Sequence, residues 1–345
     1  MNQPQSSGPF PPVPMIRALH GAAKVHSARP PHDTIHFRLH YPALWTGDDA
    51  ERLTGILPAE RDLAPWPVAI VMPGINVGSD GYRWLAETLA RAGIATVTFD
   101  FVDELMPGNI ALSPGLDVTA VAPDSYGRRP SGTALAPLLA ALQRTTKEGP
   151  VAGLVDTGRI LLIGHSAGGT VALENASTEW LPGLRGVAVY GAHTMPALML
   201  GHPHGTVLPM PSRVPALVVS GSEDGVIRAS ADRYRPDDDH DPVRRTFDEA
   251  CQHPSSRFVV LEGASHMVMC HNGDTTTARG FLDAPPTAES LRRDGEHRCL
   301  LAGLVLAFAG AVLAPRFDGD TSALDTSALD EFATHPGIAA WKDKS

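Results

Sequence analysis

The sequence predicts an α/β protein whose central sheet is mostly parallel and carries helices on both faces. Six short apolar runs, rich in β-branched residues and bounded by Gly or Pro, alternate with helical patterns along the chain. Such runs are typical of strands buried on both faces, and their alternation with helices is typical of a parallel sheet. The predicted strands are residues 66–72, 94–99, 159–163, 186–190, 216–220 and 257–261.

Helical periodicity fills the intervals between these strands. Residues 82–92 (YRWLAETLARA) form the clearest helix, which Gly93 closes as a C-terminal cap. Residues 133–147 and 167–178 occupy the same place between later strands. An antiparallel edge strand is expected over residues 34–40 (TIHFRLH), because apolar and polar side chains alternate there.

Two segments fit neither a strand nor a helix. Residues 102–131 are rich in Pro, Gly and Asp, and residues 193–213 are apolar and contain three Met. Both are expected to be long loops that follow strands. Because open α/β sheets bind ligands at the carboxyl ends of their strands, these loops are candidate pocket walls; plain surface connections are the alternative.

The chain shows no linker between two cores, so one domain is expected over residues 31–316. Residues 1–30 are expected to be a flexible lead-in, since 1–14 hold five prolines and no apolar run. Residues 317–345 contain the near repeat TSALD-TSALD and are expected to be a surface tail. The apolar stretch 299–315 is shorter than the ~20 residues that span a bilayer, which favours a buried core helix.

Composition excludes several classes of function. The 345 residues are 43% hydrophobic and 19% charged, which is too apolar for a disordered chain and sufficient for a sizeable core. A net charge of −10 argues against a general affinity for nucleic acid or for an anionic membrane. No secretory signal is visible, so a cytoplasmic location is expected. Cys251, Cys270 and Cys299 form no CxxC pair; three reduced thiols are the simplest interpretation, and one disulfide with one free thiol is the alternative.

The strongest chemical signal is Gly-His-Ser-Ala-Gly-Gly at residues 164–169. It directly follows a predicted strand and directly precedes a predicted helix. A serine on such a sharp turn has an exposed oxygen, small neighbours let the chain fold back, and the helix N-terminus favours developing negative charge. We therefore predict that Ser166 is a nucleophile; a serine that only caps the helix is the alternative.

With this motif, residues 66–313 resemble an α/β-hydrolase, in which serine, acid and histidine follow one another along the chain. A serine hydroxyl needs a histidine base that a carboxylate orients. His266 lies in a loop of small residues after the last predicted strand and is the predicted base. His253 and His271 are more simply surface or packing residues.

The resemblance places the acid after the preceding strand, where two carboxylates are adjacent. The family commonly has it a few residues past a glycine such as Gly221, which favours Asp224 and leaves Glu223 as the alternative. The acidic run at 237–241 lies further along and is most simply a solvated loop, with a surface cation site as the alternative.

Acyl transfer also needs hydrogen-bond donors for the oxyanion of the tetrahedral intermediate. The backbone N–H of Ala167, directly after the nucleophile, is one predicted donor. The resemblance makes the backbone N–H of Ile75, in the turn after strand 66–72, the second. No His-Gly-Gly-Gly motif is present, which argues against the hormone-sensitive-lipase-like esterases.

Within the superfamily, Pro73-Gly74-Ile75, GHSAGG and Gly263-Ala264-Ser265-His266 resemble cutinase-like polyesterases, chlorophyllases and dienelactone-hydrolase-like esterases. The chain departs from the polyesterases at Ile75, where they usually carry an aromatic residue, and at Ala167, where they often have Met. It departs from true dienelactone hydrolases because its nucleophile is a serine and not a cysteine.

These features predict a serine esterase that acts on a small ester with an apolar or aromatic portion. No dinucleotide-binding or Walker-type loop is present, so no cofactor is expected. No metal is expected either, since His202 and His204 have no third ligand at a recognisable spacing. An acyltransferase or perhydrolase with the same triad, a polyester hydrolase and, least favoured, a non-catalytic binding protein are the alternatives.

Overall fold

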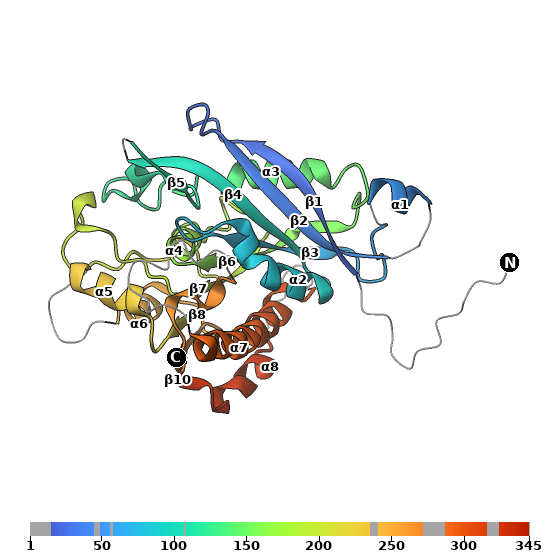
Figure 1. Cartoon of the computed structure of the whole chain (residues 1–345). Helices are drawn as coiled ribbons and strands as arrows, with labels where there is room; N and C mark the ends of the chain where they lie inside the picture. Colours follow the sequence, from blue (N-terminus) through green and yellow to red (C-terminus); the bar gives the residue numbers. More distant parts are fainter. Residues whose placement is uncertain are drawn as a thin grey trace.

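A sheet of ten strands runs through the described part of this computed structural model (Figure 1). The structure describes residues 15–44, 49–55, 58–106, 108–234, 241–271, 287–315 and 324–344. The strands are β1 (Met15–Lys24), β2 (Thr34–Ala43), β3 (Trp66–Met72), β4 (Ala95–Met106), β5 (Asn109–Leu112), β6 (Val155–His165), β7 (Leu184–Tyr190), β8 (Ala216–Gly221), β9 (Arg257–Leu261) and β10 (Ile338–Asp343). All six strands predicted from the sequence are therefore present.

The sheet is parallel at its centre and antiparallel at both edges. Its order is β1-β2-β4-β3-β6-β7-β8-β9-β10, and β5 pairs with β4 alone. Every pair from β4-β3 to β8-β9 is parallel, whereas β1-β2, β2-β4, β9-β10 and β4-β5 are antiparallel. This mixed, mostly parallel sheet with its helices confirms the predicted fold class and is consistent with an α/β-hydrolase fold.

Helices cover both faces of the sheet, as the sequence predicts. The helices are α1 (Asp49–Thr54), α2 (Arg83–Arg91), α3 (Leu135–Thr145), α4 (Ala167–Glu174), α5 (Gly225–Tyr234), α6 (Pro242–Arg245), α7 (Ala288–Leu313) and α8 (Ser327–Asp330). Single helical turns are η1 (Ser79–Tyr82), η2 (Val118–Val121), η3 (Leu198–Leu200), η4 (Thr246–Ala250), η5 (His266–Met269) and η6 (Glu331–Thr334). Gly93 follows α2 with φ +80°, the left-handed conformation of a C-terminal cap.

The alternation of side chains along each strand divides the core into two layers. On β3, Val68 and Ile70 belong to the layer that contains apolar residues of α3, α4 and α6, whereas Ala69 and Val71 belong to the layer of α2 and α7. All four side chains are almost completely buried. The strands are apolar at successive positions because both faces of the sheet are covered.

Residues 15–24 correct the expected flexible lead-in of residues 1–30. They form strand β1, which pairs antiparallel with β2 along its whole length, so β1 and not 34–40 is the edge strand. A Cβ at Gly21 would lie 2.3 Å from the Phe37 ring, so glycine lets that ring lie across β1. The segment escaped prediction because its residues are mostly half-buried and show no continuous apolar run. Residues 1–14 lie outside the described part.

The expected surface tail of residues 317–345 also contains structure. Residues 324–344 carry α8 and η6, and β10 pairs antiparallel with β9. Buried Arg257 on β9 holds this segment through ion pairs of 2.8 Å to Asp330 and 3.0 Å to Asp343. The strand escaped prediction because none of its residues is buried, so pairing with β9, and not a hydrophobic pattern, defines it.

Residues 102–131 do not form one long loop. β4 continues to Met106 and pairs with β5 as an antiparallel hairpin, and η2 follows. The segment 193–213 agrees better with its prediction, because η3 is its one regular turn within the described residues.

The apolar stretch 299–315 lies in α7, a helix longer than predicted. Within the described residues, α7 is the one helix long and apolar enough to cross a membrane. Of its most apolar 18-residue stretch, 44% is buried inside the protein. Leu304, Phe308 and Ala309 are fully buried and pack in the layer beneath β6 and β7. This sheet-facing stripe is what a core helix requires.

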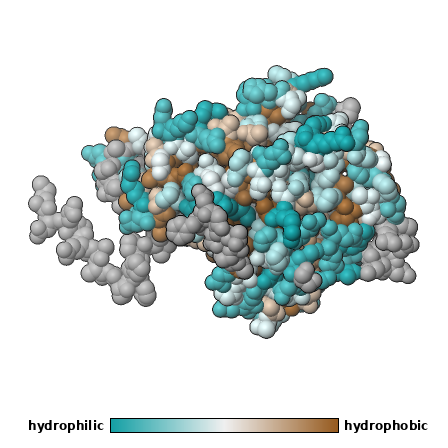
Figure 2. All heavy atoms as spheres, turned by 180° about the vertical axis from the view of Figure 1, so that it is seen from behind, coloured by the Kyte–Doolittle hydropathy of each residue, from teal (hydrophilic) through white to brown (hydrophobic). Residues whose placement is uncertain are grey.

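The face of the molecule that is turned away from the viewer in Figure 1 is largely hydrophilic. Seen from behind, polar and charged side chains predominate, with apolar residues scattered between them (Figure 2). Scattered apolar side chains are ordinary for a folded surface, so this view gives no separate indication of a partner.

Candidate active site

Ser166 occupies a sharp turn between β6 and α4. Its backbone has φ 54° and ψ −127°, a strained conformation for a residue with a side chain. The Ser166 N–H donates to the Tyr190 carbonyl at 3.0 Å, and the Ser166 carbonyl accepts from the N–H groups of Gly169 and Thr170. These hydrogen bonds hold the strained turn between the end of β7 and the first turn of α4.

Two glycines allow this turn to pack against the sheet. A Cβ at Gly164 would lie 2.4 Å from the Gly169 Cα, and a Cβ at Gly168 would lie 2.3 Å from the Met72 carbonyl oxygen. Both distances are far below van der Waals contact, so only glycine fits at either position. Gly168 thereby lets the start of α4 lie against the end of β3, and Gly164 lets it fold back onto β6.

His266 and Asp224 lie together at the carboxyl edge of the sheet. The distance from His266 Nδ1 to Asp224 Oδ2 is 2.8 Å, and both side chains are almost completely buried. The other carboxylate oxygen, Oδ1, accepts from the Ile227 N–H at 2.9 Å, at the start of α5. Both oxygens of the Asp224 carboxylate therefore accept a hydrogen bond, one from the imidazole and one from the helix backbone.

Gly191 leaves the space in which this pair meets. It follows β7 with φ +57°, and a Cβ there would lie 2.9 Å from both Asp224 Oδ2 and His266 Nδ1. The neighbouring carboxylate, Glu223, is exposed and is not hydrogen-bonded to His266. The geometry thus favours Asp224 of the two adjacent acids, and the roles of Ser166, His266 and Asp224 stay predictions.

The histidines and acids that the sequence analysis did not assign to the site have other partners. The His253 ring accepts from the Ser255 N–H, and His271 donates its backbone N–H to the Gly81 carbonyl. Asp241 caps α6 by accepting from two backbone N–H groups. Residues 237–240 of the acidic run lie outside the described residues.

The turn after β3, which carries Ile75, lies beside Ser166. A Cβ at Gly74 would lie 3.0 Å from His165 Nδ1 and 3.4 Å from the Ser166 Cβ, so the turn lies against both residues. Asn76 has φ +59°, and its N–H donates to the Leu112 carbonyl at 2.9 Å, which connects the turn to β5. The Ile75 side chain is 42% exposed at this edge. The two predicted oxyanion donors thus lie on neighbouring segments, and their role stays a prediction.

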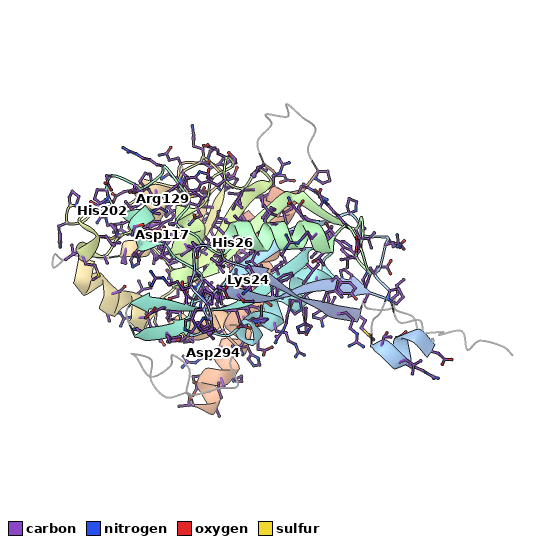
Figure 3. The ribbon with its side chains drawn as sticks, turned by 90° about the horizontal axis from the view of Figure 1, so that it is seen from above. Lys24, His26, Asp117, Arg129, His202 and Asp294 are labelled. Atoms are coloured by element: carbon purple, nitrogen blue, oxygen red, sulfur yellow. The ribbon has the colours of Figure 1, made fainter. Side chains whose placement is uncertain are left out.

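The segments 102–131 and 193–213 are joined to each other. The Tyr126 hydroxyl donates to the Pro209 carbonyl at 2.7 Å, and His202 Nε2 donates to the Val121 carbonyl at 2.6 Å. Figure 3 shows His202 close to Asp117 and Arg129, which form an ion pair within the first segment. At its start the second segment is tied to α4, because the Thr170 hydroxyl donates to the His193 carbonyl.

Tyr82 and His165 are buried polar side chains behind the site that were not predicted, and they lie beside the buried thiol of Cys270. His165 Nδ1 lies 3.0 Å from the Tyr82 hydroxyl and 3.3 Å from Cys270 Sγ, and His165 Nε2 lies 3.0 Å from the His266 carbonyl oxygen. His165 is part of the Gly-His-Ser motif, but no pattern in the sequence brings Tyr82 to it. Cys270, Cys251 and Cys299 are free thiols.

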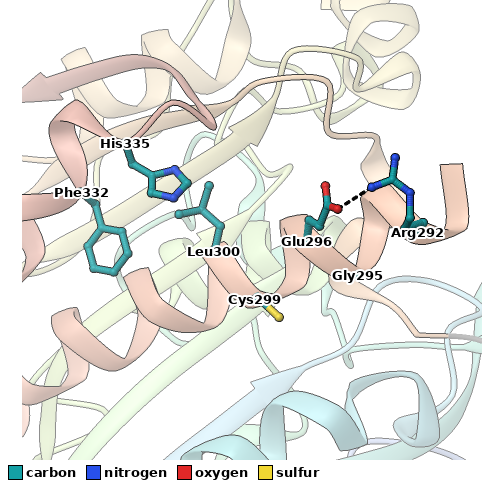
Figure 4. Close-up of a pocket in the computed structure, with 7 residues that line it drawn as sticks. All are labelled: Arg292, Gly295, Glu296, Cys299, Leu300, Phe332 and His335. Carbon is teal, nitrogen blue, oxygen red and sulfur yellow. Dashed lines mark hydrogen bonds and ion pairs between the residues drawn. The ribbon is translucent and has the colours of Figure 1, made fainter. Parts of the chain in front are cut away.

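His202 and His204 do not lie in a metal site within the described residues. No cluster of three His, Cys, Asp or Glu side chains occurs there, and His202 is engaged with a backbone carbonyl. A pocket of about 680 Å³ between α7 and η6 lies away from all these residues (Figure 4). It is lined mainly by apolar atoms of residues such as Leu300 and Phe332, and it contains none of the predicted site residues.

Replacing Gly168 with alanine tests whether the close approach of β3 and α4 is required. Because the added methyl group would meet backbone oxygens that cannot rotate away, Gly168→Ala is expected to lower the free energy of unfolding by about 1–3 kcal/mol. Gly310→Ala on α7 is the matched control; nothing lies within 4 Å of its Cβ, and it is expected to raise stability by about 0.5–1 kcal/mol. Urea denaturation measures both. Equal stability of Gly168→Ala and the wild type would contradict the account of the turn.

No protein-family model matches the chain. A segment of 178 residues, 52% of the chain, is 28% identical to the bis(hydroxyethyl) terephthalate hydrolase of Streptomyces coelicolor and spans 46% of that protein. The match thus covers about half of each protein. The mostly parallel sheet is consistent with an α/β-hydrolase fold.

Proposed function

We propose that this protein is a serine hydrolase that cleaves carboxylic esters through an acyl-enzyme on Ser166. The observation that carries the proposal is the buried 2.8 Å contact of His266 Nδ1 with Asp224 Oδ2, at the same sheet edge as the strained turn of Ser166. The distant similarity to an ester hydrolase supports the reaction class. The chemistry needs no cofactor, because the three side chains supply nucleophile, base and orienting acid.

The contact between His266 and Asp224 sets the direction of proton transfer. An ionised carboxylate can only accept hydrogen bonds, so Nδ1 of the neutral ring carries the proton and Nε2 keeps its lone pair. Nε2 then takes the proton of the Ser166 hydroxyl as the oxygen attacks the ester carbonyl. The imidazolium that forms is stabilised by Asp224, and it later returns the proton to the leaving alcohol. Water releases the acid from the acyl-enzyme by the reverse sequence of proton transfers.

The oxyanion would be held by backbone donors on either side of Ser166. The Ala167 N–H belongs to the first turn of α4, where N–H groups have no partner within the helix and the helix dipole favours negative charge. The Ile75 N–H lies on the turn whose Gly74 approaches the Ser166 side chain. Donors of this kind stabilise the transition state more than the ground state.

We further propose that the substrate is a small ester with an aromatic acyl portion. Large apolar side chains are exposed on the segments that follow the strands at this edge: Ile75, Val118, Leu198 and Met199 are 42%, 46%, 52% and 83% exposed. Exposed apolar surface suits an aromatic ring. The name of the similar protein, a terephthalate ester hydrolase, supports the same class of substrate.

Ser166→Ala is expected to lower kcat by about 10³-fold or more on p-nitrophenyl acetate, because the serine, histidine and acid act as a unit. Ser327→Ala, at an exposed position of α8, is the control and should keep wild-type activity. Initial rates of p-nitrophenol release, corrected for folded protein by circular dichroism, measure both variants. Retention of more than about a tenth of the activity in Ser166→Ala would exclude it as the nucleophile.

A matched pair of substitutions tests which of the two adjacent acids, Asp224 or Glu223, orients His266. Asp224→Asn is expected to lower kcat by about 10³-fold or more, because the amide no longer holds the proton on Nδ1 of His266. Glu223→Gln should keep most of the activity, since this side chain is exposed. The same ester assay decides, and a larger loss in Glu223→Gln than in Asp224→Asn would transfer the role to Glu223.

Substrate size is tested with bis(hydroxyethyl) terephthalate and an aromatic polyester film. The joined segments 102–131 and 193–213 favour an enclosed pocket, which buries a small ligand and excludes a polymer chain. Rapid release of terephthalate monoester from the soluble diester and slow release from the film are expected, measured by chromatography. Film hydrolysis at the rate of a secreted polyesterase run in parallel would contradict the pocket and favour the polyester hydrolase alternative.

A further inference from the structure

The predicted base and the predicted oxyanion turn lie on segments almost 200 residues apart, and buried hydrogen bonds connect them. The Gly74 N–H donates to the Tyr82 hydroxyl oxygen at 2.8 Å. The Tyr82 hydroxyl lies 3.0 Å from His165 Nδ1, and His165 Nε2 lies 3.0 Å from the backbone carbonyl oxygen of His266. Tyr82 and His165 are each 1% exposed. A continuous chain of four groups thus runs from the turn of Ile75 to the loop of His266.

The chemistry of the groups sets the direction of the hydrogen bonds in this chain. The His266 carbonyl can only accept, so His165 Nε2 carries the proton. Burial lowers the pKa of His165 to about 3, so the ring is neutral and its Nδ1 can only accept. Burial also raises the pKa of Tyr82 well above its usual value, so the hydroxyl keeps its proton. The hydroxyl lies 3.0 Å from Nδ1 and donates to it, and Cys270 Sγ lies 3.3 Å from the same nitrogen. The Gly74 N–H therefore donates to Tyr82, the Tyr82 hydroxyl donates to His165, and the His165 N–H donates to the His266 carbonyl.

The segment that carries Tyr82 is also fastened to the residues after His266. The His271 N–H donates to the Gly81 carbonyl at 2.8 Å, and the Trp84 indole N–H donates to the Met269 carbonyl at 3.1 Å. These bonds join η1 and α2 to η5. The segment of Tyr82 is therefore hydrogen-bonded to the segment that follows the predicted base, and the Tyr82 hydroxyl accepts from the oxyanion turn.

Apolar packing alone does not orient the peptide group at Gly74. A glycine has no side chain that could anchor it, and its free Cβ position faces His165 Nδ1 at 3.0 Å and the Ser166 Cβ at 3.4 Å. The hydrogen bond to Tyr82 fixes the direction of the Gly74 N–H, and thereby the plane of the Pro73–Gly74 peptide group. The following Gly74–Ile75 peptide group is held at its carbonyl, which accepts from the Val77 N–H at 3.2 Å. The next N–H along the chain is the proposed oxyanion donor.

We propose that Tyr82 and His165 are positioning residues that hold the oxyanion turn at a fixed distance and orientation relative to the loop of His266. This inference rests on the proposed esterase function of the same site. Tyr82 acts through the backbone of Gly74. His165 acts through the His266 carbonyl and also packs against the His266 ring, whose centroid lies 4.9 Å from its own. Because the oxyanion exists only after attack, their removal affects the transition state more than the bound ester.

The test compares Tyr82→Phe, His165→Gln and the double variant with the wild type. Phenylalanine keeps the buried ring and removes the hydroxyl. The glutamine amide can still donate to the His266 carbonyl, but it offers no ring nitrogen to Tyr82. Tyr41→Phe is the matched control, since Tyr41 is equally buried, lies on β2 and takes no part in the site. Titration with a p-nitrophenyl phosphonate counts the reactive sites, so that kcat is expressed per competent molecule.

Tyr82→Phe is expected to lower kcat about 10-fold on a p-nitrophenyl ester while KM stays within about twofold, and Tyr41→Phe should leave kcat unchanged. His165→Gln is expected to lower kcat by a similar factor. The double variant should lie within about threefold of either single variant, because both substitutions break the same chain. A wild-type kcat in Tyr82→Phe, or losses that multiply in the double variant, would overturn the proposal.

A measurement on the wild type keeps the proposal falsifiable if a variant fails to fold. Nitrogen-15 NMR of the His165 ring should show a neutral imidazole protonated at Nε2 throughout pH 5–9. A ring protonated at Nδ1, or a cationic ring at pH 6, would overturn the directed chain. If the wild type neither cleaves the ester nor reacts with the phosphonate, the proposed esterase function fails, whereas the ring measurement still tests the chain.

Discussion

The close packing of the turn after β6 against the end of β3 is the constraint on which the site depends. At Gly168 and Gly164 the backbones approach so closely that no side chain fits, and Ser166 between them has a strained, positive φ. Strain of this kind persists only where the surrounding structure enforces it. Here the helix α4 on one side and the sheet on the other supply that structure, and the serine is left at the carboxyl edge of the strands.

The remaining parts of the site are arranged around this turn by the order of the strands. β7 and β8 follow β6 in the sheet, so Gly191 and the loop of Asp224 come next to the serine in space. β9 then brings His266 to the same edge, where Gly191 leaves room for the imidazole and the carboxylate to meet. On the other side β3 delivers Gly74 and Ile75. Segments that are far apart in sequence therefore meet because parallel strands all end at one edge.

The sequence predicted the elements whose signal is local. The buried strands show continuous apolar runs, α2 shows helical periodicity with a glycine cap, and the glycines around Ser166 lie within six residues of one another. β1 and β10 were not predicted, because their residues are half-buried or exposed and only pairing with β2 and β9 makes them strands. The hydrogen bond between Tyr82 and His165 was likewise not predicted, because the two residues are 83 positions apart in the sequence. The cytoplasmic location and the role of each site residue stay predictions.

A crystal structure of the protein after reaction with a p-nitrophenyl phosphonate tests the central claim most directly. The account predicts a covalent bond from Ser166 Oγ to phosphorus, with the phosphoryl oxygen about 2.7–3.1 Å from the backbone nitrogens of Ile75 and Ala167. It also predicts that His266 Nε2 faces the serine oxygen while Nδ1 stays on Asp224. A phosphonate bound to any other side chain, or a phosphoryl oxygen directed away from both nitrogens, would contradict it.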